Sequence, residues 1–527
     1  MFVYSEIPKT MKGLSYMRFL SLSGGVKLRM EYFGGIVFDT DAGTMVDVDR
    51  EAFVMLSAIY DKGVINQQDL PEYLSARKIN IKSIERIEQV IGKLLELGIL
   101  VEGNGSVNEI LDEGLDNTKA AKPSWPMGPH LSAPETVHWA VTFKCGEKCP
   151  DCYAARHSGR FSTELDTQSA LEVVDKIAKW GVFQLAIGGG EPLLRQDLIE
   201  IAARARQKGL VVHVTTGCYE PDMQTLNGLS ENIKYMQIGI KHEQLVAQPE
   251  VEFTKLTRLV SLIGSMGINT GANLVLSKTT LHSLRKIVDK LVLSGFKRIT
   301  FLRYKPPADI TRWKAENPST ESMLKAETLL QKLKYDYPKF EFRLDCGLSF
   351  LQRKVSPDKA LLSGVRGCVA SNRIVSIAAD GAVYPCSQLV YPQFYSGNIH
   401  KDEVEQFWIK SKGLKTHRFY REKSEFKRSV CGICKARNHC GGCRVFADNV
   451  TIGADKGCHD PVLMSPGELD KNGRYADLML FCMNNFGISV EEYMERYGVG
   501  IKKIENWIDE DDENSYPKWL KGLDEYI

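Results

Sequence analysis

Apolar and polar residues alternate with the period of a strand near the start of the chain and with the period of a helix directly after it. Residues 25–49 read as three short strands, separated by the turn residues Gly34-Gly35 and Asp41-Ala42-Gly43. Residues 50–63 and 83–97 then follow a helical pattern. Strands followed by helices predict a small winged-helix domain over residues 1–101. Residues 102–136 are rich in Gly, Pro, Ser and Asn, and we interpret them as a linker.

From Val137 onward, short apolar segments alternate with amphipathic helical segments. Six segments have the length and composition of buried strands: residues 137–143, 183–189, 210–217, 235–240, 271–277 and 299–304. Helical periodicity fills the intervals, for example over residues 168–180, 197–209, 253–267 and 281–295. Repeated βα units imply parallel strands with right-handed crossovers. We therefore expect an α/β fold with a partial (βα)6 TIM-type barrel over residues 137–340, with its chemistry at the carboxyl ends of the strands.

Composition narrows the class of protein without identifying it. The 527 residues are 43% hydrophobic and 25% charged, as in an ordinary soluble globular protein. A formal net charge of +2 gives no reason to expect binding to nucleic acid or to an anionic membrane. We find no apolar run of about 20 residues and no signal-peptide pattern, so we expect a cytoplasmic protein.

Cysteine is the unusual component. The chain has 13 cysteines, and eleven of them lie within residues 145–152 or between Cys346 and Cys458. Disulfides rarely persist in the cytosol, where clustered cysteines are more often metal ligands. We therefore expect bound metal and no disulfide framework.

The first cysteine group directly follows the first predicted barrel strand. Residues 145–152, CGEKCPDC, contain Cys145, Cys149 and Cys152, and the next cysteine is Cys218. A structural zinc site takes four ligands, and this triplet supplies only three. When the triplet is considered alone, bound zinc is still an alternative. GGGEP, residues 188–192, ends the second predicted strand and therefore lies on the same face of the barrel.

The cysteine triplet followed one βα unit later by GGEP resembles the radical S-adenosylmethionine (SAM) superfamily. The resemblance implies that the three cysteines hold a [4Fe-4S] cluster whose fourth iron is open to SAM. It also implies SAM contacts from the GGE residues, with Glu191 accepting from the SAM ammonium group. The candidate SAM contacts are Gly189, Gly190, Glu191, Thr215 and Arg303.

Two positions depart from the family pattern. Asp151 stands before the third cysteine, where an aromatic residue is common. GIKHEQ, residues 239–244, follows the fourth strand, where a serine that touches the ribose is common. The contacts to the ribose and adenine of SAM are therefore left open.

A second group of cysteines follows the barrel. Residues 431–443, CGICKARNHCGGC, contain two CxxC pairs, which in isolation are also typical of a zinc ribbon. Behind a radical SAM core the group resembles the SPASM extension, here residues 341–463, which holds two auxiliary iron–sulfur clusters. The resemblance implies one cluster bound by Cys431, Cys434, Cys440 and Cys458. The other would be bound by Cys368, Cys386 and Cys443, with Cys346 as a candidate fourth ligand.

The N-terminal domain resembles the PqqD-like recognition elements of enzymes that modify ribosomally synthesised peptides. The resemblance implies that the leader of a precursor peptide adds as a strand beside Thr44 to Val48, against the helix at residues 83–97. A DNA-binding winged helix or a purely structural domain is the alternative. The candidate peptide contacts are Met45, Val46, Asp47, Ile84, Ile87 and Ile91.

The C-terminal segment, residues 464–527, carries seven Lys/Arg against fourteen Asp/Glu. An acidic segment is a poor binder of phosphate backbones, so we expect no nucleic-acid partner and interpret the segment as an acidic helical cap.

These resemblances imply a radical SAM peptide maturase. We expect a 5′-deoxyadenosyl radical to remove a hydrogen atom from a precursor peptide, made of leader and core, with an electron donor such as flavodoxin or ferredoxin. Auxiliary clusters favour a net oxidation, and so a thioether or carbon–carbon crosslink over epimerisation. The alternatives are peptide excision or decarboxylation, maturation of a folded protein such as a sulfatase or of a quinone or tetrapyrrole precursor, and a non-enzymatic iron–sulfur or zinc protein.

Overall fold

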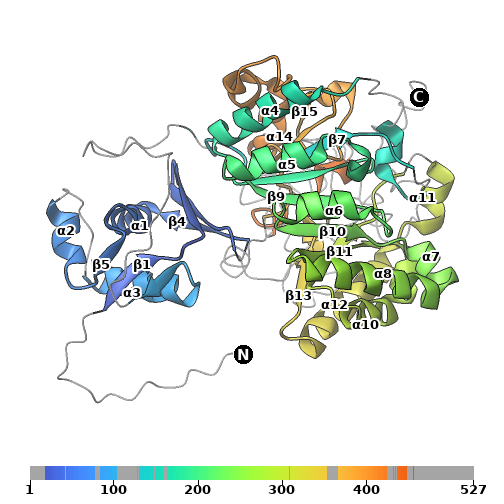
Figure 1. Ribbon diagram of the computed structural model, residues 1–527, viewed down its shortest axis with the longest axis horizontal. Helices are drawn as coiled ribbons and strands as arrows, with labels where there is room; N and C mark the ends of the chain where they lie inside the picture. Colours follow the sequence, from blue (N-terminus) through green and yellow to red (C-terminus); the bar gives the residue numbers. More distant parts are fainter. Residues whose placement is uncertain are drawn as a thin grey trace, which may run out of the picture. The chain divides into compact units, whose positions relative to one another are not determined.

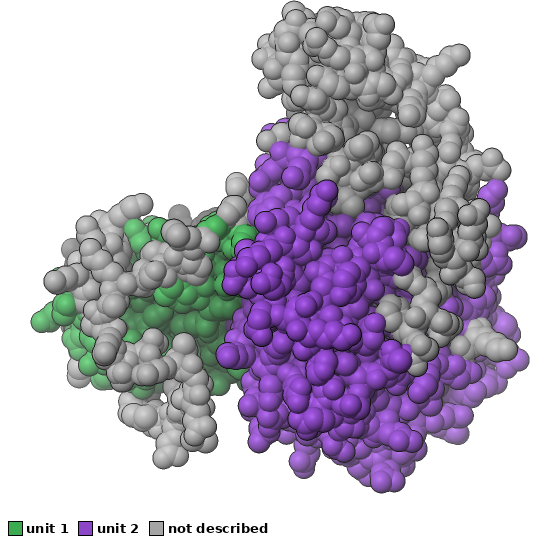
Figure 2. All heavy atoms as spheres, turned by 90° about the horizontal axis from the view of Figure 1, so that it is seen from above, with its two compact units in different colours: residues 1–132 green, residues 133–527 purple. Residues whose placement is uncertain are grey.

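The chain folds into two compact units, residues 1–132 and residues 133–527 (Figure 2). The computed structural model describes residues 18–41, 43–76, 84–103, 128, 130–146, 149–157, 163–307, 309–352, 366–423, 426, 431, 434, 436–447 and 455. The predicted ligand Cys458 and the predicted cap at residues 464–527 lie outside these described residues.

The first unit contains an antiparallel sheet in the order β2-β3-β4, followed by helices (Figure 1). Its elements are β2 (Val26–Glu31), β3 (Gly34–Asp39), β4 (Thr44–Asp49), α1 (Arg50–Lys62), α2 (Leu70–Ala76) and α3 (Ile84–Glu96). The three predicted strands and both predicted helices are confirmed. Helix α1 begins after Asp49 because the Asp49 carboxylate accepts a hydrogen bond from the Ala52 N–H (2.8 Å), which caps the first turn.

A second, smaller antiparallel sheet in the same unit has the order β5-β1-β6. Its strands are β1 (Phe19–Leu22), β5 (Val64–Asn66) and β6 (Leu100–Glu102). Sequence analysis missed this sheet because strands of three or four residues are too short to establish an alternating pattern.

The second unit is built on a nine-stranded sheet in the order β13-β12-β11-β10-β9-β8-β7-β14-β15. The six predicted strands are confirmed as β7 (Thr136–Thr142), β8 (Gln184–Gly189), β9 (Val211–Thr216), β10 (Tyr235–Gly239), β11 (Asn269–Leu276) and β12 (Arg298–Arg303). All neighbouring pairs from β7 to β12 are parallel. The expected α/β partial barrel is therefore correct.

The segment predicted as the SPASM domain extends this sheet at both edges. β13 (Glu341–Leu344) pairs with β12 in parallel. β14 (Ile374–Ile377) pairs in parallel with β7, and β15 (Val383–Tyr384) continues the edge in the antiparallel sense. Both edges of the barrel sheet are thus formed by residues from beyond position 340.

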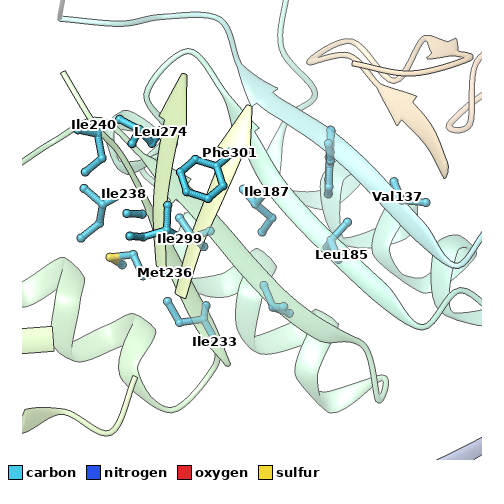
Figure 3. Packing of buried hydrophobic residues seen from close by; sticks show 14 of the residues in the cluster. Val137, Leu185, Ile187, Ile233, Met236, Ile238, Ile240, Leu274, Ile299 and Phe301 are labelled. Carbon is cyan, nitrogen blue, oxygen red and sulfur yellow. The ribbon is translucent and has the colours of Figure 1, made fainter. Parts of the chain in front are cut away.

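Helices cover one side of the sheet (Figure 1). They are α4 (Thr167–Trp180), α5 (Leu198–Gln207), α6 (Met223–Ser230), α7 (His242–Ala247), α8 (Pro249–Ser265), α9 (Lys278–His282), α10 (Leu284–Leu293) and α12 (Thr320–Asp336). Helix α11 (Ile310–Glu316) packs instead through Trp313 against Tyr304 and Phe446, and α14 (Lys412–Arg418) comes later in the chain. Buried side chains such as Ile187, Met236 and Phe301 pack in the core between strands and helices (Figure 3). No helix among the described residues has both the length and the apolar character needed to cross a bilayer.

The opposite side of the sheet, here called the inner face, is less completely buried. In β7, Val137, Trp139 and Val141 are buried, whereas His138 and Ala140 between them are half-buried. The same alternation occurs in β8 and in the first four residues of β9. Because alternate residues of a strand point to opposite sides, the helix side is closed and the inner face is only half-buried.

Arg195 fastens the loop after β8 to the end of β7. Its buried guanidinium donates to the backbone oxygens of Val141 (2.7 Å) and Leu165 (2.8 Å) and pairs with Asp197 (2.6 Å). Removing one partner of a buried ion pair leaves the other charge without compensation. This contact therefore helps to fix the ends of the first two barrel strands relative to each other.

We predict that Arg195→Met lowers the thermal stability of the second unit strongly, because a loss of about 3–5 kcal/mol is typical for breaking a buried ion pair. The matched control is Arg204→Met, since Arg204 forms an exposed ion pair with Asp175 between α4 and α5 (2.6 Å). Melting curves followed by circular dichroism should show a clear decrease for the first variant and little change for the second. Equal melting temperatures would contradict this role of Arg195.

Candidate cluster and cofactor site

The loop after β7 carries Cys145, Cys149 and Cys152 at the carboxyl end of the parallel sheet, as predicted. Cys145 and Cys149 are exposed and Cys152 is half-buried. The Cys152 N–H donates to the Cys149 oxygen (3.2 Å), so the last two thiols are carried by a tight turn. Burial raises the pKa of Cys152 above its usual range, which means that a bound metal ion would be needed to hold it as a thiolate at neutral pH.

The GGE loop after β8 lies directly against the base of the cysteine loop. The Gly190 N–H donates to the Thr142 oxygen (2.8 Å), and the Glu191 N–H donates to the Lys144 oxygen (2.9 Å). A Cβ on Gly189 would lie 2.2 Å from the Thr142 oxygen, and one on Gly190 would lie 2.2 Å from the Lys144 oxygen. The glycines are therefore required by the close approach of two backbone segments, in addition to any contact with SAM.

Glu191 joins the ends of β8 and β9. Its side chain is buried, and one oxygen accepts from the Thr216 hydroxyl (2.8 Å) and from the Leu193 N–H (3.1 Å). The other oxygen accepts from the Gly217 N–H (2.9 Å). A carboxylate has about four acceptor positions, so room for a donor such as an ammonium group is left. Thr215, the predicted SAM contact, is exposed, and its neighbour Thr216 makes the bond to Glu191.

Arg303 lies at the end of β12, but its guanidinium is buried and already paired. It donates to the Asp455 carboxylate (2.8 Å) and to the Gly347 oxygen (3.1 Å), and it stacks over the Phe446 ring at 3.3 Å from the ring centre. Asp455 is fully buried and also accepts from the Cys443 N–H (2.7 Å). The predicted contact of Arg303 with SAM would therefore have to compete with an existing ion pair.

Seven of the predicted auxiliary ligands are described, and six of them are buried. Cys346 is half-buried, and the buried ones are Cys368, Cys386, Cys431, Cys434, Cys440 and Cys443. Four of these belong to one packed cluster with Tyr304, Trp313 and Phe446, namely Cys368, Cys386, Cys431 and Cys443. The structure therefore brings the cysteines from opposite ends of the predicted SPASM segment together.

Electrostatic effects between the thiols support the proposed ligand group that includes Cys346. Burial raises the pKa of Cys346 well above its usual range, and the charges of Asp345, Cys443 and Cys368 raise it further. Burial, followed by the charge of Cys368, raises the pKa of Cys386 to about 12. Cys368, Cys386 and Cys443 belong to one buried cluster, and the charges of Cys443 and Cys368 act on Cys346.

Glycines allow the short CGGC spacing between Cys440 and Cys443. Gly441 and Gly442 both have positive φ angles, 62° and 68°, which favour glycine. Gly367, with φ 64°, packs so closely that a Cβ there would lie 1.6 Å from the Cys440 oxygen. Any side chain at Gly367 would push Cys368 and Cys440 apart.

The charge balance around these cysteines fits an iron–sulfur cluster. Arg444 is fully buried against the rings of Tyr420 and Phe426. Burial alone would lower the pKa of its guanidinium, but the negative charges of Cys431, Cys368 and Asp455 help to raise that pKa above its usual value. The Arg444 Nη2 donates to the Gly441 oxygen (3.0 Å), beside the Cys440 and Cys443 that flank the two glycines. Thiolates bound to iron would add negative charge next to this guanidinium.

Among the described residues, no three His, Cys, Asp or Glu side chains converge closely enough to hold a single metal ion. The cysteines of a [4Fe-4S] cluster each bind a different iron atom, so they need not meet at one point.

The predicted peptide contacts in the first unit divide into two groups. Met45, Val46 and Asp47 are half-buried in β4, which forms one edge of the β2-β3-β4 sheet. Ile87 and Ile91 are buried in the core of the unit, so their side chains pack within it. The side chain of Ile84 lies outside the described residues.

Sequence reasoning missed two residues that hold the loops in place. Arg195 and Asp455 are polar residues without a spacing motif, and partners of both lie far away in sequence. Their only signal in the sequence is a polar residue beside a motif, which is too common to be informative.

Comparison with known proteins agrees with this arrangement. Residues 139–291 match the Radical SAM superfamily, and residues 368–441 match the SPASM iron–sulfur cluster-binding domain. The Fe-coproporphyrin III synthase of Methanosarcina barkeri is 26% identical over 292 residues, covering 52% of this chain and 73% of that protein. The PqqA peptide cyclase of Methylobacterium sp. is 24% identical over 348 residues, covering 63% of this chain and 86% of that protein.

Solved structures show a similar fold. SuiB of Streptococcus suis bound to S-adenosylmethionine superposes with a TM-score of 0.60 at 17% identity, covering 83% of this chain and 99% of SuiB. SuiB bound to its precursor peptide SuiA superposes with a TM-score of 0.56 at 15% identity, covering 84% of this chain. The matches to the Radical SAM superfamily and to the SPASM domain identify the chain as a radical SAM superfamily enzyme that carries a SPASM iron–sulfur cluster-binding domain.

Proposed function

We propose that this enzyme modifies a ribosomally made precursor peptide, binding the leader at the first unit and the core peptide at the inner face of the barrel. The observation that carries the proposal is the extent of the similarity to SuiB. It covers 83% of the chain, more than the second unit alone (residues 133–527) accounts for. SuiB has been crystallised with a precursor peptide, which supports a peptide substrate for a chain of the same architecture.

The residues that would hold the groups needed for this chemistry are all in the second unit. Cys145, Cys149 and Cys152 would bind the cluster that receives SAM, and the GGE loop would receive the methionyl end of SAM. When bound, the cluster and SAM would supply a 5′-deoxyadenosyl radical that removes a hydrogen atom from an unactivated carbon. The chain itself would hold that carbon close to the radical and exclude water.

The inner face near the cysteine loop leaves space for a substrate. Ala140 and Ala186 on this face have small side chains, and Gly188 has none. All three are half-buried, although they lie in the middle of the sheet. Small residues at this place would accommodate a peptide side chain at the carboxyl ends of β7 and β8 more readily than large ones.

The two auxiliary cysteine groups favour a net oxidation. Clusters held there would accept the electron that remains when a substrate radical closes a bond, so a thioether or carbon–carbon crosslink is the proposed product. The low-potential electron that starts the reaction would come from a donor such as flavodoxin or ferredoxin.

Maturation of a tetrapyrrole precursor is the second candidate. The similarity to the Fe-coproporphyrin III synthase of Methanosarcina barkeri favours it, but that similarity covers only 52% of the chain. A tetrapyrrole substrate would not use the edge strand β4 of the first unit, whereas a leader peptide would bind beside it.

The first prediction concerns iron. Anaerobically reconstituted enzyme should bind about twelve iron atoms, as three [4Fe-4S] clusters require. Replacing Cys145, Cys149 and Cys152 together with alanine should remove about four of them and abolish SAM cleavage. Cys218→Ala is the matched control, because this half-buried cysteine belongs to none of the three ligand groups. Its loss should leave the iron content unchanged. Bound zinc without broad visible absorbance would contradict the assignment.

The second prediction concerns Glu191. If the carboxylate accepts from the SAM ammonium group, Glu191→Ala leaves that charge without a partner, a loss of about 1.5–3 kcal/mol. SAM affinity measured by calorimetry should then fall roughly ten- to a hundredfold with the cluster intact. Thr216→Val is the control, since it removes one hydrogen bond to Glu191 and keeps the carboxylate. If both variants weakened SAM binding equally, Glu191 would act only by holding β8 to β9.

The third prediction concerns the leader peptide. Binding by strand addition at β4 relies on main-chain hydrogen bonds, so a proline at Val46 should weaken it. Leu28→Pro in β2 is a matched control, because Leu28 and Val46 both pair with Val37 and both pack against the core of the unit. Fluorescence anisotropy with the labelled leader of a candidate precursor peptide should show weaker binding for Val46→Pro only.

Removing residues 1–101 tests the same idea from the other side. SAM cleavage without substrate should persist, because the cysteine loop and the GGE loop lie entirely in the second unit. Modification of the full precursor should nearly vanish, since a bound leader holds the core peptide at millimolar effective concentration. A truncated enzyme that processes the precursor at the full-length rate would make the first unit a structural domain.

A further inference from the structure

We propose that Asp151, Arg312, Tyr304 and Glu243 form an ion-pair network that positions the cysteine loop and sets the reduction potential of the cluster held there. The network includes Asp151 and a residue of the GIKHEQ segment, the two places at which this sequence departs from the radical SAM pattern. The inference rests on the proposed function, because it presumes that Cys145, Cys149 and Cys152 bind that cluster.

Asp151 lies in the cysteine loop between Cys149 and Cys152, and two distant residues bind its carboxylate. One oxygen accepts from the Tyr304 hydroxyl (2.6 Å) and from Nε of Arg312 (2.8 Å). The other oxygen accepts from Nη2 of Arg312 (3.1 Å). A two-point contact between a guanidinium and a carboxylate is strong and directional, so the loop is held in one orientation.

Arg312, in α11, also pairs with Glu243 at the start of α7. Glu243 belongs to the GIKHEQ segment after β10, where a serine is common in the family, and Asp151 stands where an aromatic residue is common. A single guanidinium therefore binds Asp151 and a residue of the unusual GIKHEQ segment. The two departures are best explained together, as two carboxylates that share one cation.

The partners of Asp151 are themselves held firmly. Tyr304 is buried and stacks on Trp313 at 5.3 Å between ring centres, and Trp313 stacks on Phe446 at 6.1 Å. Burial is the main cause that raises the pKa of Tyr304, and the hydrogen bond to Asp151 raises it further. The phenol therefore stays protonated and donates a hydrogen bond to Asp151. Phe446 lies under Arg303, which pairs with Asp455. The cysteine loop is thus connected through packed side chains to the auxiliary cysteines.

The network also places opposite charges beside the cluster ligands. Asp151 directly precedes Cys152, and its side chain is only 11% exposed, so solvent screens its charge weakly. A carboxylate at this position disfavours adding an electron to the cluster, and the Arg312 guanidinium, 23% exposed, favours it. The charges should therefore affect the reduction potential in opposite directions.

The experiment uses full-length enzyme, anaerobically reconstituted, with the reduction potential of its clusters followed by electron paramagnetic resonance. The signal that changes on adding SAM identifies the cluster at the cysteine loop. Asp151→Asn should raise the potential of that cluster, and Arg312→Met should lower it, with unchanged iron content. Asp175→Asn, which breaks the exposed ion pair with Arg204, is the matched control and should change neither.

A loop-holding role without an electrostatic one predicts a different result. Both variants would then lose iron or shift the potential in the same direction, and either outcome would overturn the inference, as would unchanged potentials. Tyr304→Phe removes a hydrogen bond to Asp151 without removing charge, so it should alter the SAM-induced spectral change and leave the potential near that of the wild type. Wild-type enzyme without a SAM-sensitive signal would refute the proposed function itself.

Discussion

Two backbone segments at the carboxyl ends of β7 and β8 approach each other so closely that only glycine fits between them. Hydrogen bonds from Gly190 and Glu191 to Thr142 and Lys144 define this approach. It fixes the GGE loop against the base of the cysteine loop, and Glu191 then extends the connection to Thr216 at the end of β9. A cluster and its SAM ligand need to be held in one relative position, and this backbone contact provides that constraint before either is bound.

The auxiliary region is organised by a different constraint, the compensation of buried charge. Arg303 and Arg444 are both buried near the Asp455 carboxylate, in a region lined by aromatic rings and cysteines. Thiolates bound to iron would add further negative charge beside these guanidinium groups. The same residues connect β12 to Cys443, so the charge balance of the auxiliary site also holds the SPASM segment against the barrel.

Local patterns predicted much of this structure, and long-range polar contacts account for most of what they missed. Apolar periodicity predicted the six barrel strands and the strands β2, β3 and β4 of the first unit, because each of these strands buries one side or both. The cysteine loop and the GGE loop follow from short spacings that only a few chemistries use. Arg303 shows the limit of such reasoning, since its place at the end of β12 was correct while its partner, Asp455, is 152 residues away in sequence. Ile87 and Ile91 show another limit, because an apolar helical face indicates burial but does not say whether the partner is the core or a ligand.

The central claim is that this radical SAM enzyme acts on a peptide, and mass spectrometry of the encoded precursor tests it most directly. Reduced enzyme should be incubated anaerobically with SAM and the precursor, and in parallel with a tetrapyrrole precursor. The account predicts that 5′-deoxyadenosine forms faster when the precursor is present, and that the peptide loses a pair of hydrogen atoms at a new crosslink. An unchanged precursor mass, together with conversion of the tetrapyrrole, would contradict it.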